Sequence, residues 1–274
     1  MATPNIAQAL TIAGSDSGGG AGIQADLKTM HAHGVFGTSV ITAVTAQNTL
    51  AVFETFDLPV SIVEAQLNAV LEDFEIAAVK TGMLSSSAIV RTTADALAAH
   101  AINRIIVDPV MISTSGDKLL TGEAIDTLKN TLLAHALLVT PNLHEAELLA
   151  EMSIESEKDM KIAAKRIRSY GCENVLVKGG HAEFKKATDL LFDGKNYHEF
   201  PGEFVATDNL HGTGCTFSAA ITARLALGEP LLEAIAKAKI YISHAISNAL
   251  DIGRGHGPTD HFYFLDRNDF DPPT

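Results

Sequence analysis

The sequence has few cysteines, no excess of basic residues and no long apolar run. Its two cysteines, Cys172 and Cys215, lie far apart without CxxC spacing, which excludes a disulfide framework and is typical of a reducing compartment. Lysine and arginine number 20 against 33 acidic residues, and the formal net charge of −13 argues against a nucleic-acid-binding surface. We therefore expect small molecules or proteins as partners, and no nucleic acid.

The lack of long apolar runs also argues against a membrane protein. No apolar stretch approaches the roughly 20 residues that span a bilayer, and Met1–Leu10 lacks the basic and apolar segments of a signal peptide. We expect a cytoplasmic protein without membrane contact. A chain of 274 residues with 46% hydrophobic content can bury one large core, so the expected organisation is a single domain, 1–274, with a frayed tail at 266–274.

Short β-rich segments alternate with longer segments of helical periodicity. The expected strands are Ala9–Ala13, Ser39–Thr45, Ala77–Lys80, Arg104–Val107, Leu137–Thr140 and Asn174–Lys178. The expected helices among them are Gly22–His33, Val60–Phe74, Ser86–His100, Gly122–His135, Asn142–Ala150 and Glu157–Tyr170. This alternation predicts an α/β fold with a mostly parallel central sheet flanked by helices on both faces.

The alternation ends after the sixth strand. Asp193-Gly194 separates Leu190–Phe192 from Tyr197–Phe200, which predicts a β-hairpin near the C-terminal third of the chain. Two helices, Thr216–Leu227 and Leu231–Leu250, are expected to follow. Because ligands of an open parallel sheet bind beyond the carboxyl ends of its strands, the residues at those ends are the candidate site.

The segment Gly212-Thr213-Gly214-Cys215 runs directly into the expected helix Thr216–Leu227. A helix N-terminus behaves as roughly +0.5 of a charge. Its free backbone N–H groups bind anions, and glycines let a ligand approach the backbone closely. The segment is therefore a candidate anion site with Cys215 at its entrance; an ordinary glycine-rich connection from a strand to a helix is the alternative.

A second glycine-rich segment, Ala13–Gly22, follows the first expected strand. It matches neither GxxxxGK[ST] nor a GxGxxG pattern in its proper register, so the sequence does not support a Walker or dinucleotide loop. Five glycines within nine positions would expose backbone donors and acceptors at the end of a strand, which favours a substrate wall or lid. A flexible turn without a ligand is the alternative.

Two residues at strand ends could contact a heterocycle. Gln47 follows the second expected strand, and its amide supplies both a donor and an acceptor, which suits a ring nitrogen beside an amino group. A polar loop residue is the alternative for Gln47. Met83 could form an apolar wall of the site, or could fill the core or the surface.

Charged residues stand at the remaining strand ends. Asp108 could meet a divalent cation or a ligand hydroxyl, and Lys178 could reach a nucleotide phosphate or be a solvated lysine. Asn142 and Glu145 have the spacing of a capping box at a helix start. Glu145 could also orient hydrated Mg²⁺, which typically uses one or two carboxylates beside phosphate oxygens. These two interpretations of Glu145 are compatible.

The motifs occur in one order over almost the whole chain, and together they closely resemble the bacterial hydroxymethylpyrimidine/phosphomethylpyrimidine kinases of thiamine biosynthesis, members of the ribokinase-like superfamily. The segments that carry the resemblance are Ala9–Asp26, Thr42–Thr49, Lys80–Met83, Val107–Met111, Thr140–Asn142 with Glu145, Val177–His181 and His211–Cys215. Each motif alone is weak, and their joint order is specific.

The resemblance implies transfer of the ATP γ-phosphoryl group to an aminopyrimidine alcohol, and then to the resulting monophosphate. It implies that Gln47 hydrogen-bonds the aminopyrimidine and that other residues complete that pocket, namely Gly14, Asp26, Val44 and Met83. Lys178, Asn142, Gly180 and Thr213 are implied for ATP, Asp108 and Glu145 for Mg²⁺ partly through water, and Gly212, Thr213, Gly214 and Cys215 for the anion hole. The family also implies a homodimer.

Cys215 stands where many ribokinase-like enzymes have an aspartate that acts as general base. The pKa of a thiol, about 8.5, falls at a helix N-terminus, so we expect that Cys215 can form a thiolate and accept the proton of the acceptor hydroxyl. A phosphate monoester needs little base. Cys215→Ser is therefore predicted to impair the first phosphorylation more than the second.

A pyridoxal or pyridoxine kinase is the alternative function, since that activity occurs on similar chains with a Gly-Cys anion turn. Gln47 within Thr-Ala-Gln-Asn-Thr favours the aminopyrimidine. A sugar kinase is disfavoured because Cys215 replaces an aspartate. A catalytically silent vitamin-binding protein is disfavoured because Asp108, Glu145, Lys178 and Cys215 occur together.

Overall fold

The computed structural model describes residues 6–111, 120–180 and 187–266; the expected fraying of 266–274 falls almost entirely outside these residues. In this part of the chain one sheet of nine strands has the order β3-β2-β1-β4-β5-β6-β7-β8-β9. The strands are β1 (Gln8–Asp16), β2 (Phe36–Gln47), β3 (Val52–Asp57), β4 (Ile76–Thr81), β5 (Ile105–Val107), β6 (Leu138–Val139), β7 (Asn174–Val177), β8 (Asp189–Phe192) and β9 (Tyr197–Phe200). The run from β2 to β7 is parallel, and β3, β8 and β9 are antiparallel to their neighbours. The predicted mostly parallel sheet and hairpin are confirmed.

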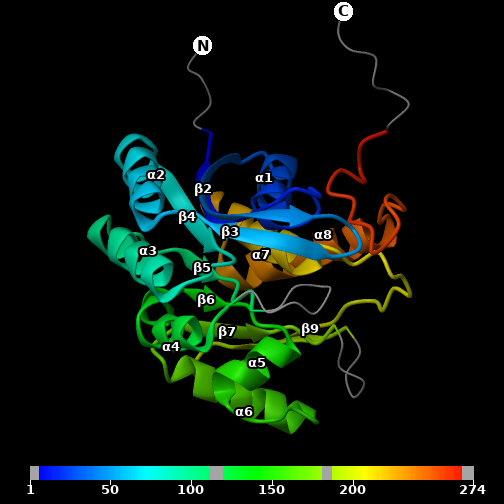
Figure 1. The fold of residues 1–274 in the computed structure, drawn as a ribbon. Helices are drawn as coiled ribbons and strands as arrows, with labels where there is room; N and C mark the ends of the chain where they lie inside the picture. The colour runs from blue at the N-terminus through cyan, green and yellow to red at the C-terminus, as the bar shows by residue number, and fades with distance from the viewer. Residues whose placement is uncertain (1–5, 112–119, 181–186, 267–274) are drawn as a thin grey trace, which may run out of the picture.

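Helices cover both faces of this sheet (Figure 1). They are α1 (Gly22–Ala32), α2 (Val60–Asp73), α3 (Ser87–Ala99), α4 (Gly122–Asn130), the 3-10 helix η1 (Leu132–His135), α5 (Leu143–Ala150), α6 (Glu157–Arg168), α7 (Thr213–Ala226) and α8 (Leu231–Ser247). One buried apolar cluster joins the sheet to α2 through α6, and a second joins the opposite face to α1, α7 and α8. The sheet is therefore the middle of three layers.

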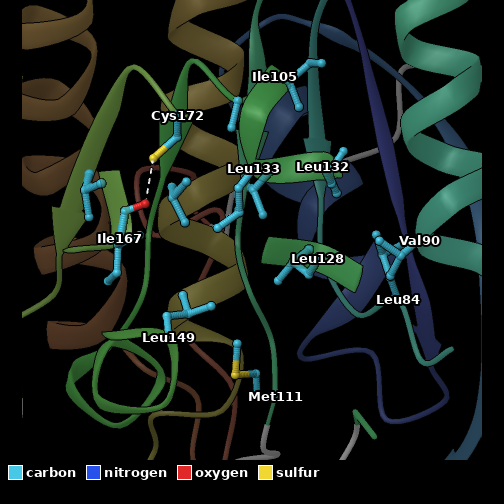
Figure 2. Packing of buried hydrophobic residues seen from close by; sticks show 14 of the residues in the cluster. Leu84, Val90, Ile105, Met111, Leu128, Leu132, Leu133, Leu149, Ile167 and Cys172 are labelled. Atoms are coloured by element: carbon cyan, nitrogen blue, oxygen red, sulfur yellow. Dashed lines mark hydrogen bonds between the residues drawn. The ribbon is translucent and has the colours of Figure 1, made fainter. Parts of the chain in front are cut away.

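The packing beneath α3 to α6 is formed by large aliphatic side chains of the first cluster (Figure 2). Leu84, Ile105 and Leu132 are each no more than 1% exposed. Cys172 belongs to this cluster, where its thiol contacts the carbonyl oxygen of Ile167 at 3.6 Å, and burial raises its pKa to about 12. Cys172 is thus a structural thiol of the core.

Polar side chains set the starts of four helices. Ser86, Thr121, Asn142 and Ser156 each accept a hydrogen bond from the backbone N–H three residues ahead. Asn142 and Glu145 complete the predicted capping box, because Glu145 also accepts from the Asn142 N–H at 2.8 Å. Each capping residue and its partner are close neighbours in the sequence, so these helix starts can be predicted from the sequence alone.

Three differences from the sequence prediction bear on the fold and the site, and other element ends differ by a few residues. The strand β3 was not predicted, because its side chains are almost all exposed and leave no alternation of buried and exposed positions. The predicted helix Gly122–His135 is interrupted at Thr131, whose backbone leaves the helical region. The helix predicted to begin at Thr216 begins at Thr213 as α7, so the Gly-Thr-Gly-Cys segment is itself the helix N-terminus.

Candidate functional site

A cavity of about 780 Å³ lies at the carboxyl ends of the parallel strands. Backbone hydrogen bonds bring these ends side by side: the Asp108 N–H donates to the Thr81 carbonyl, and the Lys178 N–H donates to the Pro141 carbonyl. The predicted site residues that line the cavity are Gly14, Gln47, Met83, Asp108, Asn142, Glu145, Lys178, Gly180, Gly212, Thr213, Gly214 and Cys215. Segments separated by up to 200 residues of sequence thus form one site.

Two predicted substrate contacts, Asp26 and Val44, are not among the lining residues. Asp26 is fully buried; its carboxylate accepts from Lys80 Nζ at 2.8 Å and from Thr11 Oγ1 at 2.6 Å. Because Lys80 pairs with this buried carboxylate, a direct contact of Asp26 with the substrate stays a prediction. Val44 is 43% exposed on β2, and its place in the substrate pocket also stays a prediction.

The N-terminus of α7 presents backbone donors to the cavity. Gly212 is its N-cap, with φ of +78°, and the Thr213 N–H is used by the Leu210 carbonyl. Among the described residues, the N–H groups of Gly214 and Cys215 have no acceptor. Two free donors at the positive end of a fourteen-residue helix form the geometry of an anion hole.

Lys178 lies directly against this helix start. A Cβ placed on Gly214 would be 3.3 Å from Lys178 Nζ, and Nζ pairs with Asp108 Oδ1 at 3.0 Å. Burial works against the charge of Lys178, but the carboxylates of Asp108 and Glu145 outweigh it and raise the pKa of the ammonium. Lys178 therefore carries a positive charge beside the two free N–H groups.

Asp108 and Glu145 form the acidic part of the cavity. Asp108 is 1% exposed and also accepts from Ser218 Oγ at 3.0 Å; burial opposes its charge, but Lys178 and Lys80 hold the pKa of the carboxyl below its usual range. Burial, together with the negative charge of Asp108, raises the pKa of Glu145 to about 7. Two mutually repelling carboxylates in one cavity fit a divalent cation held by few protein ligands.

Cys215 differs from its sequence-based expectation. It occupies the third position of α7, where the helix N-terminus favours a thiolate, yet burial dominates and raises the pKa of the thiol to about 11. Lys80 acts in the opposite direction and lowers it, without overcoming the burial. In the ligand-free protein Cys215 is therefore a neutral thiol at neutral pH.

Gln47 is the last residue of β2 rather than a loop residue. Its side-chain oxygen accepts from Thr45 Oγ1 at 3.1 Å, and within the described residues its amide nitrogen has no partner. Met83 is 6% exposed, and its terminal methyl would lie 2.5 Å from a Cβ on Gly14. Glycine at position 14 thus gives Met83 the space to form an apolar wall beside Gln47.

Several backbone donors of the glycine-rich loop after β1 are used within the protein. The Gly18, Gly20 and Ala21 N–H groups all donate to the carboxylate of Asp16, at 2.7 to 3.0 Å. Asp16 also accepts from His211 Nε2 at 2.8 Å. The loop therefore forms a wall of the cavity that is held in shape by one buried carboxylate.

Sequence reasoning assigned no role to many of the residues that line the cavity, among them five that form ion pairs: Asp16, Lys80, His211, Asp189 and Lys239. Lys80 interrupts an otherwise apolar strand, Ile76–Thr81. A lysine at such a position needs a buried partner, so the sequence does indicate a buried ion pair here. The other two pairings, Asp16 with His211 and Asp189 with Lys239, join distant segments. Asp189 accepts from Lys239 Nζ at 2.7 Å and from the Gly179 N–H at 2.9 Å, which fixes the turn after Lys178.

In the described part of the chain, no helix combines the length and the apolar character needed to cross a bilayer. No group of three or more His, Cys, Asp or Glu side chains there could hold a metal ion by itself. A cation at Asp108 and Glu145 would therefore need further ligands from water or from a bound phosphate.

Comparison with known proteins gives concordant matches. A family model described as phosphomethylpyrimidine kinase matches residues 16–260. The chain is 49% identical over 265 residues to the hydroxymethylpyrimidine/phosphomethylpyrimidine kinase of Haemophilus influenzae, a match that covers 95% of this chain and 98% of that protein.

Solved structures agree with the sequence matches. The phosphomethylpyrimidine kinase of Clostridium difficile superposes with a TM-score of 0.78 at 45% identity, covering 87% of this chain and 99% of that one. The pyridoxal kinase of Staphylococcus aureus, in complex with AMP-PCP and pyridoxal, superposes with a TM-score of 0.88 at 35% identity, covering 94% of each chain. The ribokinase-like fold expected from the resemblance is confirmed.

Proposed function

The chain belongs to the phosphomethylpyrimidine kinase family, and on this premise we propose which of its residues carry the family's reaction. The activity is ATP-dependent phosphorylation of 4-amino-5-hydroxymethyl-2-methylpyrimidine, followed by phosphorylation of the monophosphate to the diphosphate. The observation that carries the residue assignment is the convergence of Lys178 with the two free N–H groups of α7.

This convergence fits phosphoryl transfer. The transition state is loose and places charge on the oxygens of the transferred group, so positioning and charge stabilisation supply most of the catalysis. The Gly214 and Cys215 N–H groups are proposed to donate to these oxygens, while Lys178 neutralises them. Asn142, Gly180 and Thr213 are proposed to line the path of the ATP phosphates, because they border the same cavity.

The acceptor is proposed to bind at the opposite end of the cavity, between Gln47 and Met83. The free amide nitrogen of Gln47 would donate to a pyrimidine ring nitrogen and its oxygen would accept from the 4-amino group. Gly14 provides room for the methionine wall. Cys215 lines the same cavity, and the hydroxymethyl group of the substrate is proposed to point toward it.

Cys215 is proposed to accept the hydroxyl proton in the first step. Because the free thiol has a raised pKa, it must first give its own proton to solvent, and Lys80 is the cation whose charge favours the resulting thiolate. The thiolate then takes the hydroxyl proton as the acceptor oxygen bonds to the γ-phosphorus and ADP leaves. The second step has an ionised monoester as acceptor and needs no base. The requirement for Cys215 is therefore specific to the first step.

Mg²⁺ is proposed to bind between Asp108 and Glu145. Their carboxylate oxygens suit this ion, and a divalent charge would stabilise the ionised form of Glu145, whose pKa is raised by burial and by the negative charge of Asp108. When bound, the ion neutralises phosphate charge. The capping box fixes the Glu145 carboxylate independently of any ligand, since that carboxylate also accepts from the Asn142 N–H.

We propose a homodimer of single-domain protomers that pairs through the β2–β3 edge. Phe53 and Phe56 are 68% and 64% exposed on an edge strand, and Val44 on β2 is also exposed. Exposed apolar groups on a sheet edge are typical of an interface. Sedimentation of the wild type and of Phe56→Glu tests it, with a shift from dimer to monomer expected.

Pyridoxal phosphorylation is the second candidate, supported by the similarity to a pyridoxal kinase that binds AMP-PCP and pyridoxal. The two candidates are separated by incubating the purified chain with ATP and equal concentrations of the aminopyrimidine alcohol and pyridoxine. Aminopyrimidine phosphates as the main products support the proposed function. A predominance of pyridoxine phosphate would contradict it.

A further inference from the structure

His211 joins three segments that are far apart in the sequence. Its imidazole Nε2 lies 2.8 Å from Asp16 Oδ2 on the loop after β1, its main chain contacts the C-terminal segment Gly257–His261, and the next residue is the N-cap of α7. We propose that Asp16 and His211 are a positioning pair that holds the anion hole in register with the cavity.

The Asp16 side of the pair is rigid. Both oxygens of this carboxylate are used, since Oδ1 accepts from the Gly18 N–H and Oδ2 accepts from Gly20, Ala21 and His211. Burial opposes the charge of Asp16, but the hydrogen bond and electrostatic attraction of His211, together with the N–H groups of Ala21 and Gly18, outweigh it and lower the pKa of the carboxyl. Asp16 therefore fixes the loop and His211 with one buried charge.

The loop and the helix start interlock at backbone level. Gly212 has φ of +78°, and a Cβ there would collide with the carbonyl group of Gly20. A Cβ on Gly20 would in turn collide with the His211 ring and lie 3.0 Å from Pro258. Gly212 is required because its backbone touches the backbone of Gly20, and Gly20 is required because its backbone touches the His211 ring and Pro258. A shift of the loop would therefore move the N-terminus of α7.

The C-terminal segment supports the helix start from the other side. The His211 N–H donates to the Gly257 carbonyl at 3.1 Å, and Pro258 forms an isolated bridge with His211. Thr216 Oγ1, in the first turn of α7, lies 3.1 Å from His261 Nε2. His261 is 4% exposed, and burial lowers its pKa to about 4, so this contact uses a neutral ring.

Neither residue is assigned contact with the transferred phosphoryl group. Their effect is on the placement of the Gly214 and Cys215 N–H groups, and a misplacement of about 1 Å in such a site can cost on the order of 100-fold in rate. Removing one donor of an oxyanion hole costs a similar factor, about 100 to 1,000-fold. The expected fall in kcat rests on the proposed function. The expected displacement of the α7 N-terminus does not depend on it.

The experiment compares His211→Leu, which removes the hydrogen bond to Asp16, with His211→Gln, whose amide nitrogen can replace Nε2 as donor. The control is His33→Leu, because His33 is a half-buried histidine that packs on Tyr241 and does not line the cavity, whereas the buried His211 does. Asp16→Asn is a second variant on the other side of the pair. Each is assayed for kcat and KM and by hydrogen exchange of a peptide spanning 210–217.

For His211→Leu and Asp16→Asn we expect kcat to fall about 100-fold, KM for ATP and acceptor to change less than threefold, and exchange in 210–217 to accelerate. His211→Gln should recover at least tenfold of the lost kcat. His33→Leu should leave kcat and this exchange unchanged.

Unchanged exchange in 210–217, equal losses in His211→Leu and His211→Gln, or a loss carried only by KM would each overturn the pair's role. A wild-type protein without kinase activity would instead refute the proposed function. The exchange comparison would then still decide whether the pair positions α7.

Discussion

The substitution Asp26→Asn removes one charge from a fully buried ion pair. Both Asp26 and Lys80 are 0% exposed, and Lys80 Nζ lies 2.8 Å from each carboxylate oxygen. The neutral amide leaves the lysine charge in the core without its counter-ion. Breaking such a pair costs about 3–5 kcal/mol, which corresponds to a fall in Tm of roughly 6–20 °C at about 2–4 °C per kcal/mol.

The assay is denaturant unfolding of the ligand-free protein, followed by circular dichroism. Glu151→Gln is the matched control, since it removes the acidic partner of Lys129 in an ion pair of similar length, 2.7 Å, whose carboxylate is 73% exposed. Its midpoint should match the wild type, because solvent screens the pair. If Asp26→Asn and Glu151→Gln unfold at the same denaturant concentration, the role assigned to Asp26 is wrong.

A double substitution separates stability from function at this pair. Asp26→Leu with Lys80→Met replaces the ion pair by apolar groups, which is often neutral or stabilising, so the unfolding midpoint should recover relative to Asp26→Asn. The first phosphorylation should remain impaired, because Lys80 is the cavity cation that lowers the pKa of Cys215. Recovery of both stability and first-step activity would refute the function of Lys80.

Three further perturbations test the site. Cys215→Ser should reduce kcat of the first phosphorylation at least tenfold more than that of the second; equal losses in separate steady-state assays would contradict the step-specific role. Alkylation of Cys215 by iodoacetamide should be slow at pH 7 and should accelerate as the pH rises toward about 11, because only the thiolate reacts and the pKa of Cys215 is raised. Rapid alkylation at pH 7, assigned to Cys215 by peptide mapping, would refute the neutral thiol. Gly212→Ala should lower the free energy of unfolding, measured in urea, more than Gly34→Ala does. Both glycines have positive φ, but only Gly212 faces a carbonyl group that a Cβ would strike. Equal losses would show that the interlock with Gly20 is unimportant.

The parts of the fold that could be predicted from the sequence are those with a local signal. Gly, Pro and capping residues mark the ends of the helices, and buried apolar runs mark the central strands. The capping box of Asn142 and Glu145 is an example, since it is complete within four residues. The strand β3 escaped prediction because it is held by pairing with β2 and not by a buried face.

Most of the predicted site residues line the cavity, because parallel strands deliver their carboxyl ends to one edge of the sheet. Partners across the fold were not predictable in the same way. The carboxylate of Asp26 pairs with Lys80, 54 residues away, and the carboxylate of Asp16 pairs with His211, 195 residues away. The pKa of Cys215 depends on burial by other segments, which opposes the local effect of the helix N-terminus.

The convergence of Lys178 and the free N–H groups of α7 on one phosphoryl group is tested most directly by Lys178→Met. The control is Lys195→Met, because Lys195 is absent from the cavity lining. Each protein is incubated with ATP and the aminopyrimidine alcohol, and the products are identified by mass. We predict monophosphate and diphosphate from the wild type and Lys195→Met, and a loss of kcat on the order of 100 to 1,000-fold for Lys178→Met in both steps. Full activity of Lys178→Met would contradict this assignment of the site.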